Sequence, residues 1–182
     1  MRLFLAADLT AIQVNALARL VDAAKIAAPF DWIRWLPREN WHATLAFIGD
    51  RGDGDVPALI DRVEPHLRPQ TGLLVKPGRI QAFPSRGNPR LLVLKGDSDS
   101  KLDQLVFKLH QSVGLKPPTP FRFHVSVARF KELDKEHRDR LLSAIRDLEA
   151  LAEQWTIESI SLYSSKLHPT GATYQRIQTW EF

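Results

Sequence analysis

Two short segments of the chain repeat each other, and this repeat constrains the fold more than any other feature of the sequence. Residues 41–46 read Trp-His-Ala-Thr-Leu-Ala, and residues 123–128 read Phe-His-Val-Ser-Val-Ala. Position by position, both give an aromatic residue, histidine, any residue, a hydroxyl residue, an aliphatic residue and alanine. Their histidines, His42 and His124, lie 82 positions apart in a chain of 182 residues. A spacing close to half the chain indicates two equivalent halves.

The order of the predicted secondary-structure elements repeats as well. Apolar periodicity in the first half predicts strand 2–7, helix 10–28, strand 41–48, helix 56–67 and extended segment 72–83. The first helix begins with Thr10 and Gln13, which have the spacing of a capping box. The second half predicts strand 91–95, helix 102–113, strand 121–128, helix 141–148 and extended segment 155–163. A last strand, 173–180, would pair with its neighbour across a turn at 168–171.

We therefore expect a single α+β domain over residues 1–182, built from two pseudo-symmetric β-α-β-α-β lobes. The lobes would span approximately 1–88 and 89–182, with an exchange of terminal strands between them allowed. Mainly antiparallel sheets would surround a central groove. Hydrophobic residues make up 44% and charged residues 25%, which is the mixture of a globular protein.

The start of the chain and its lack of cysteine exclude several classes of protein. The apolar segment 1–7 stops at Asp8, so it is too short for a signal peptide or a membrane span. We expect a cytoplasmic monomer with no membrane and no obligate protein partner. Without cysteine there is no disulfide framework, thiolate nucleophile or cysteine-based metal site.

Strand alternation predicts which side chains share a face of each motif strand. On the first, His42, Thr44 and Ala46 would point away from the core, and Leu45 and Phe47 into it. On the second strand, the corresponding outward residues are His124, Ser126 and Ala128. By the same rule Arg129 lies opposite His124, so it reaches the groove only if the strand ends or bulges near Ala128.

Two imidazoles facing one groove are suited to acid–base chemistry near neutral pH. An unperturbed pKa of about 6.5 lets one ring be neutral while the other is protonated. One can accept a proton from a nucleophile while the other protonates a leaving oxygen. The hydroxyls of Thr44 and Ser126 could hydrogen-bond phosphate oxygens. This chemistry requires no metal and no cofactor. The alternative, two satisfied core histidines, is weakened by their equivalent places in the repeat.

Other features are weaker indications of function. The sequence has no His-Glu-x-x-His, so a histidine metal site is disfavoured. A third His-x-Thr, at 168–170, contains proline and precedes glycine, so we interpret it as a turn. Phe47, Trp35 and Trp41 could stack on a base, although packing is the commoner role of an aromatic residue beside a strand.

Basic residues gather in two stretches that contain no acid, 65–96 and 104–131. They could be solvated surface charge or a surface that faces a phosphate-bearing partner. Arg86 and Arg90 lie in a loop with glycine and proline, and we predict them as RNA contacts outside the motifs.

Taken together, these motifs resemble the 2H phosphoesterase superfamily, and most closely its RNA 2′,3′-cyclic phosphodiesterases, also called 2′-5′ RNA ligases. The resemblance covers nearly the whole chain and rests on residues 2–4, 6, 34–35, 40, 42–45, 47, 49, 83–84, 89–90, 124–129 and 165–174. It implies a bilobal α+β fold with both motifs facing a central groove. Ser126 stands where the family more often has threonine, which keeps the hydroxyl.

The resemblance also implies an activity. The family opens a terminal 2′,3′-cyclic phosphate to a 2′-phosphate without a metal, and some members reversibly join RNA ends through a 2′-5′ bond without ATP. His124 would activate water, His42 would protonate the departing 3′-oxygen, and Arg129 would contact phosphate. The partners would be RNA ends or cyclic nucleotides that carry a 2′,3′-cyclic phosphate. The alternative is a non-catalytic RNA- or nucleotide-binding module that uses the same groove.

Overall fold

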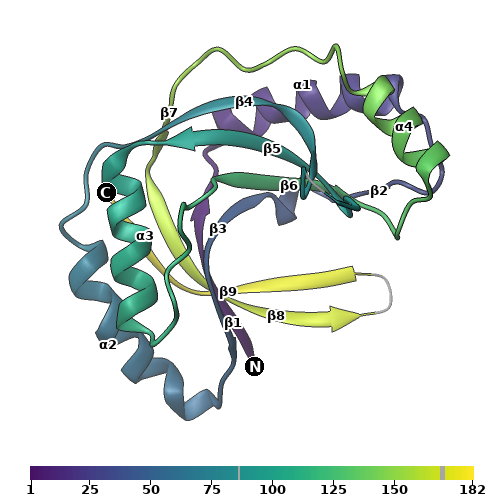
Figure 1. Cartoon of the computed structure of the whole chain (residues 1–182). Coiled ribbons are helices and arrows are strands. Elements are labelled where there is room, and N and C mark those ends of the chain that lie inside the picture. The colour runs from purple at the N-terminus through teal and green to yellow at the C-terminus, as the bar shows by residue number, and fades with distance from the viewer. Residues whose placement is uncertain (86, 169–170) are drawn as a thin grey trace.

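The computed structural model describes residues 1–85, 87–168 and 171–182, so Arg86 lies outside the described residues. Its centre is a curled nine-stranded sheet in the order β7-β4-β5-β6-β3-β1-β8-β9, with β2 paired to β6 (Figure 1). The strands are β1 Arg2–Asp8, β2 Arg34–Trp35, β3 His42–Asp50, β4 Leu73–Phe83, β5 Leu91–Ser98, β6 His124–Arg129, β7 Trp155–Ile157, β8 Ser159–His168 and β9 Gly171–Glu181. Neighbouring strands in the described part of the sheet run antiparallel.

Four α-helices cover the sheet in the described part of the chain. They are α1 Ala11–Ala27, α2 Val56–Leu67, α3 Ser100–Ser112 and α4 Lys135–Ala144, with short 3₁₀ helices η1 Arg38–Asn40 and η2 Asp53–Asp55. Helices α2 and α3 pack together on one side of the molecule, whereas α1 and α4 lie at the other end of the sheet (Figure 1). The predicted α+β class with antiparallel strands is confirmed. None of the described helices is long and apolar enough to cross a membrane.

Local sequence explains where the helices begin. The Thr10 side chain accepts a hydrogen bond from the Gln13 backbone at 3.3 Å, and the Gln13 side chain accepts one from the Thr10 backbone at 3.0 Å. The predicted capping box is therefore present. Gln13 also donates to the carbonyl of Thr156 at 2.8 Å, which ties α1 to β7.

Helix α4 differs from its prediction at both ends. Asp134 caps it by accepting from the His137 backbone at 2.8 Å, so the helix begins before residue 141. It ends at Ala144, and Leu142 is 43% exposed. Further along, Leu151 donates its backbone N–H to the carbonyl of Gly78 at 2.9 Å, so the chain there is bonded to β4 and not to a helix. The predicted end at residue 148 was wrong, because apolar residues continue at helical spacing beyond Ala144 although the helix does not.

The sheet mixes strands from both halves of the sequence. Strands β3 and β6, which carry the two motifs, lie side by side at its centre. Strand β4 from the first half pairs with β5, and β8 from the second half pairs with β1. The hairpin of β8 and β9 joins at His168 and Gly171, as predicted for the last strand.

Candidate active site

Strands β3 and β6 meet at Ala43, which pairs with Val125. These two residues are equivalent positions of the repeat, so a local two-fold axis passes between them. In an antiparallel pair this register sets His42 opposite Ser126 and Thr44 opposite His124. The paired residues Ala43 and Val125 are fully buried, whereas the four motif side chains are half-buried. All four therefore share the face turned away from the core, where cross-strand neighbours are in contact.

A β-bulge in β3 corrects part of the predicted alternation. The pairing with β1 passes from Ala6 opposite Thr44 to Leu5 opposite Ala46, which leaves Leu45 as the extra residue. Leu45 and Ala46 are both buried, and the next side chain, Phe47, is 68% exposed. The prediction that Ala46 faces the groove and Phe47 the core was wrong, because the bulge reverses the parity of the strand.

Strand β6 has its bulge at the equivalent place. Its pairing with β5 passes from Val93 opposite Ser126 to Leu92 opposite Ala128, which leaves Val127 as the extra residue. Val127 and Ala128 are both fully buried and Arg129 is exposed. Ala128 therefore does not face the groove as predicted. The bulge instead turns Arg129 to the same face as His124. A bulge near Ala128 was the condition under which Arg129 could share that face.

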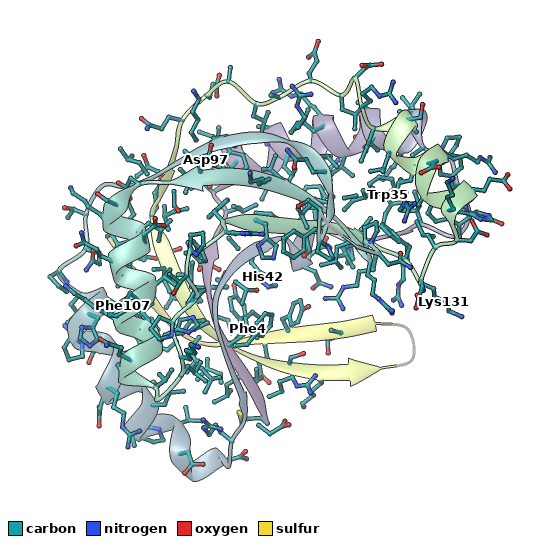
Figure 2. The ribbon with its side chains drawn as sticks, in the orientation of Figure 1. Phe4, Trp35, His42, Asp97, Phe107 and Lys131 are labelled. Atoms are coloured by element: carbon teal, nitrogen blue, oxygen red, sulfur yellow. The ribbon has the colours of Figure 1, made fainter. Side chains whose placement is uncertain are left out.

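His42 sits in an aromatic enclosure. Its ring stacks on Phe4 with centroids 5.0 Å apart and meets the edge-on ring of Tyr174 at 5.1 Å, with Tyr163 parallel at 6.0 Å. Figure 2 shows His42 and Phe4 between the β8–β9 hairpin and β6. Burial lowers the pKa of His42 from 6.5 to about 4, against the raising effects of the Asn40 backbone and of Asp8. The free protein therefore holds this ring neutral near pH 7.

The charges of Arg129 and His124 also lower the pKa of His42. Both groups therefore act on the His42 ring through space, which places them within electrostatic reach of it.

His124 is oriented by two contacts. Its Nδ1 faces the carbonyl oxygen of Arg122 at 2.8 Å, and because a carbonyl only accepts, Nδ1 carries the proton. The ring stacks on Phe83 with centroids 4.9 Å apart and planes 16° apart. The hydrogen bond leaves Nε2 available to exchange a proton with a bound molecule.

Two cavities open at His124. One of about 630 Å³ is lined by His124 together with Gln81, Phe83 and Lys95. The other, of about 450 Å³, is lined by His124 with Thr44 and Phe47. Both volumes are in the range of small-molecule sites. Within the described residues, no three or more His, Asp or Glu side chains cluster in a way that could hold a metal ion.

Comparison with known families matches this chain to the LigT-like phosphoesterases over residues 10–93 and 96–174. The chain belongs to this family. The predicted membership of the 2H phosphoesterases is confirmed, and with it the prediction of an enzyme that cleaves phosphodiester bonds.

Relatives and solved structures cover this phosphoesterase from end to end. An RNA 2′,3′-cyclic phosphodiesterase of Methanothermobacter thermautotrophicus is 26% identical, covering 98% of this chain and 97% of its own. One of Archaeoglobus fulgidus is 26% identical and covers 100% of both chains. Among structures, a Thermus thermophilus protein has a TM-score of 0.77 at 23% identity, over 100% and 97% of the chains. Escherichia coli LigT in complex with 3′-AMP gives 0.73 at 18% identity, over 99% and 97%.

The phosphoesterase also has a half-buried polar cluster around Asp8, the register partner of His42, that the sequence did not indicate. Asp8, 11% exposed, accepts a hydrogen bond from the Tyr163 hydroxyl at 2.5 Å and from the Ser161 hydroxyl at 2.5 Å. Arg176 donates to the Tyr163 oxygen at 3.1 Å. Burial, and next the bond to Asp8, raise the pKa of the Tyr163 phenol. Asp8 is opposite His42 in the β1–β3 register, and only that register reveals its place at the site.

The remaining predicted residues have separate places. Arg90 makes an exposed ion pair with Glu132 at 2.9 Å and lines neither cavity at His124, and its contact with RNA stays a prediction. Trp41 is 6% exposed and donates its indole N–H to the Leu36 carbonyl at 3.2 Å, which is a packing role. The predicted contact by Arg86 and residues 169–170 of the third His-x-Thr lie outside the described residues.

Proposed function

We propose that this protein hydrolyses the 2′,3′-cyclic phosphate at an RNA end to a 2′-phosphate, without a metal, using His42 and His124 as acid and base. The observation that carries the proposal is the register of Ala43 with Val125. It gives two imidazoles on one face, each with a hydroxyl side chain opposite it on the next strand. The names of the relatives, RNA 2′,3′-cyclic phosphodiesterases, support the choice of substrate.

In the proposed reaction, the Nε2 atom of His124 accepts a proton from water as the water oxygen attacks phosphorus. The bond from phosphorus to the 3′-oxygen breaks, and His42 gives its proton to that oxygen. The product is a 2′-phosphate monoester beside a free 3′-hydroxyl. The hydroxyls of Thr44 and Ser126 and the charge of Arg129 would hold the non-bridging oxygens.

The low pKa of His42 is consistent with a proton donor that works only with substrate bound. Its value of about 4 in the free protein makes the imidazolium a stronger acid than an imidazolium in water, whose pKa is about 6.5. A bound phosphodiester anion beside the ring raises that pKa and brings the proton onto it. Because the ring is enclosed, His42 takes up its proton only when the anionic substrate binds.

The same geometry supports a ligase activity. A 5′-hydroxyl of a second RNA in the place of water would attack phosphorus and give a 2′-5′ linkage, with the same two proton transfers. Because the linkage replaces one phosphodiester with another, the step is reversible and needs no ATP.

A turnover assay tests the proposal. Wild type should convert a 2′,3′-cyclic nucleotide to the 2′-phosphate in excess EDTA, and His42→Ala and His124→Ala should each abolish this. Loss of wild-type activity on chelation would overturn the metal-free mechanism. If wild type binds the cyclic nucleotide but does not turn it over, the site is a non-catalytic binding module instead.

A sulfur substitution separates the two roles. In a cyclic substrate whose bridging 3′-oxygen is replaced by sulfur, the leaving thiolate needs no proton. His42→Ala should recover activity on this substrate and His124→Ala should not. If only His124→Ala recovers activity, His124 is the acid and His42 the base.

A further inference from the structure

A further cavity is lined by Arg129 but by neither His42 nor His124. It has a volume of about 700 Å³, and its wall includes Trp32, Arg34, Arg129, Phe130, Lys131 and Leu133. Arg34 and Arg129 also line an adjoining cavity of about 420 Å³, together with Tyr174. The Tyr174 ring is 5.1 Å from that of His42. The two adjoining cavities therefore extend from Tyr174, beside His42, past Arg34 and Arg129 to Trp32.

The two arginines stand side by side between these cavities. Arg34 of β2 is the register partner of Arg129 of β6. A Cβ added at Gly171 would lie 2.5 Å from Nη2 of Arg34, so the guanidinium reaches from β2 to the first residue of β9. Glycine at 171 leaves room for it. In the described part of the chain neither guanidinium has an acidic partner, so both charges are available to an anion.

Three cations and two acids line the cavity. Glu132 is paired with Arg90 at 2.9 Å, and Asp134 contacts Nδ1 of His137 at 2.8 Å, a pair that is ionic only when His137 is protonated. Lys131 is exposed on the same wall. Figure 2 places Lys131 at the outer end of the molecule near α4, and Phe107 of α3 at the opposite side. The net charge presented to the cavity is therefore positive.

The apolar part of the wall is a set of packed aromatic rings. The Trp32 ring stacks on Phe30 with centroids 5.0 Å apart, and meets Phe130 edge-on at 5.9 Å and His137 edge-on at 5.7 Å. Trp32 is half-buried and still lines the cavity. A preformed aromatic surface beside cations is the combination that binds a base and its phosphate in single-stranded nucleic acids.

We propose that this cavity binds the nucleotide preceding the cyclic-phosphate end of an RNA. Its base would pack on the wall of Trp32, and its phosphates would lie on Arg34 and Lys131. The inference rests on the proposed function and deepens it, because it makes an oligomer, rather than a cyclic mononucleotide, the preferred substrate. The volume of about 700 Å³ suits a single nucleotide.

The first test compares two substrates in the wild type. A trinucleotide ending in a 2′,3′-cyclic phosphate should have a higher kcat/KM than the cyclic mononucleotide with the same terminal base, by about five- to 100-fold if one base stacks. Equal values would overturn the inference and leave the proposed function intact. Hydrolysis of neither substrate would overturn the proposed function.

Variants then locate the effect. Trp32→Ala should reduce the trinucleotide-to-mononucleotide ratio to near one, and Trp32→Phe should restore much of it. Lys131→Gln is a second variant that leaves the aromatic packing around Trp32 unchanged, because Lys131 is exposed. It should make the slope of log(kcat/KM) against log salt concentration less negative by about 0.7 for the trinucleotide, as expected when one phosphate contact of a single strand is lost. Lys108→Gln, on the far helix α3, is the matched control and should change neither value.

A binding measurement keeps the inference testable without turnover. A fluorescent RNA pentamer ending in a 2′-phosphate should bind Trp32→Ala and Lys131→Gln more weakly than wild type and Lys108→Gln, as read by anisotropy. Equal affinity of all four proteins would place the RNA elsewhere.

Discussion

Phe47 and Arg129 occupy equivalent positions in β3 and β6, each directly after a buried alanine that follows a bulge. Both bulges turn the next side chain onto the face of the histidines. In one half that side chain is a phenyl ring 6.1 Å from Phe4, and in the other it is a guanidinium. The two histidines are thus placed symmetrically in surroundings that are not symmetric. His42 is enclosed by aromatic rings, and the single cation at the repeated position belongs to the other strand.

Arg129 should contribute to phosphate binding through its charge. Arg129→Gln should lower kcat/KM on a cyclic nucleotide by about 10- to 100-fold, the usual value of a charge-assisted hydrogen bond. Arg129→Lys should recover part of this loss, because it keeps the charge but not the paired donors. The variants are compared by steady-state kinetics at fixed ionic strength. If Arg129→Gln has the same kcat/KM as wild type, Arg129 does not contribute to phosphate binding.

Arg129 also acts on His42 in the free protein. Its charge lowers the pKa of His42, so Arg129→Gln should raise that pKa above about 4. The acidic limb of the kcat/KM profile, which reports free-enzyme pKa values, should move to higher pH in the variant. A limb that stays in place would show that it belongs to another group.

Much of this site follows from the sequence, and the part that does not has a physical cause. The repeat and the strand periodicity predict the central strands and the shared face of His42, Thr44, His124 and Ser126. Alternation fails just beyond them, because a bulge depends on pairing with β1 or β5 and leaves no signal in the strand itself. The Asp8 cluster was missed for the same kind of reason: Tyr163 is far from Asp8 in sequence and meets it only through sheet register.

His42 should make stability depend on pH. Its folded-state pKa of about 4 is below the unfolded value of 6.5, so the unfolded chain takes up the proton first as pH falls. The stabilisation is complete above pH 6.5 and is lost as pH falls toward 4, by up to about 3 kcal/mol. Urea unfolding should show that the free energy of unfolding falls between pH 7 and pH 5 in both proteins. The fall should be roughly 2 kcal/mol smaller in His42→Gln than in wild type. Equal losses in both proteins would contradict the enclosure of the ring.

Tyr163 should stabilise the fold by donating a hydrogen bond to the half-buried carboxylate of Asp8. Tyr163→Phe removes the donor at 2.5 Å and should lower the free energy of unfolding by about 1–3 kcal/mol. Tyr174→Phe is the matched control, since that ring also packs against His42 and Phe4, and its hydroxyl has no bonded partner in the described part of the chain. Urea unfolding that ranks the two variants equally would count against the cluster.

Gly96 should be sensitive to the smallest added side chain. A Cβ there would lie 2.8 Å from Cγ1 of Val75 and 3.0 Å from Phe123, so Gly96→Ala should cost about 1–3 kcal/mol. Because Phe123 precedes His124, turnover should fall as well. Gly54→Ala is the control, since a Cβ at Gly54 meets no atom within 4 Å. Equal unfolding curves for both variants would refute this packing.

We propose that two histidines open a cyclic phosphate to the 2′-phosphate, and not the 3′-phosphate, without a metal. The most direct measurement is the phosphorus NMR spectrum of an RNA oligomer ending in a 2′,3′-cyclic phosphate, incubated with the protein in excess EDTA. With wild type, the cyclic signal should be replaced by that of a 2′-phosphate monoester, and with the double variant His42→Ala/His124→Ala it should persist. A 3′-phosphate product, or equal conversion by the double variant, would contradict this proposal.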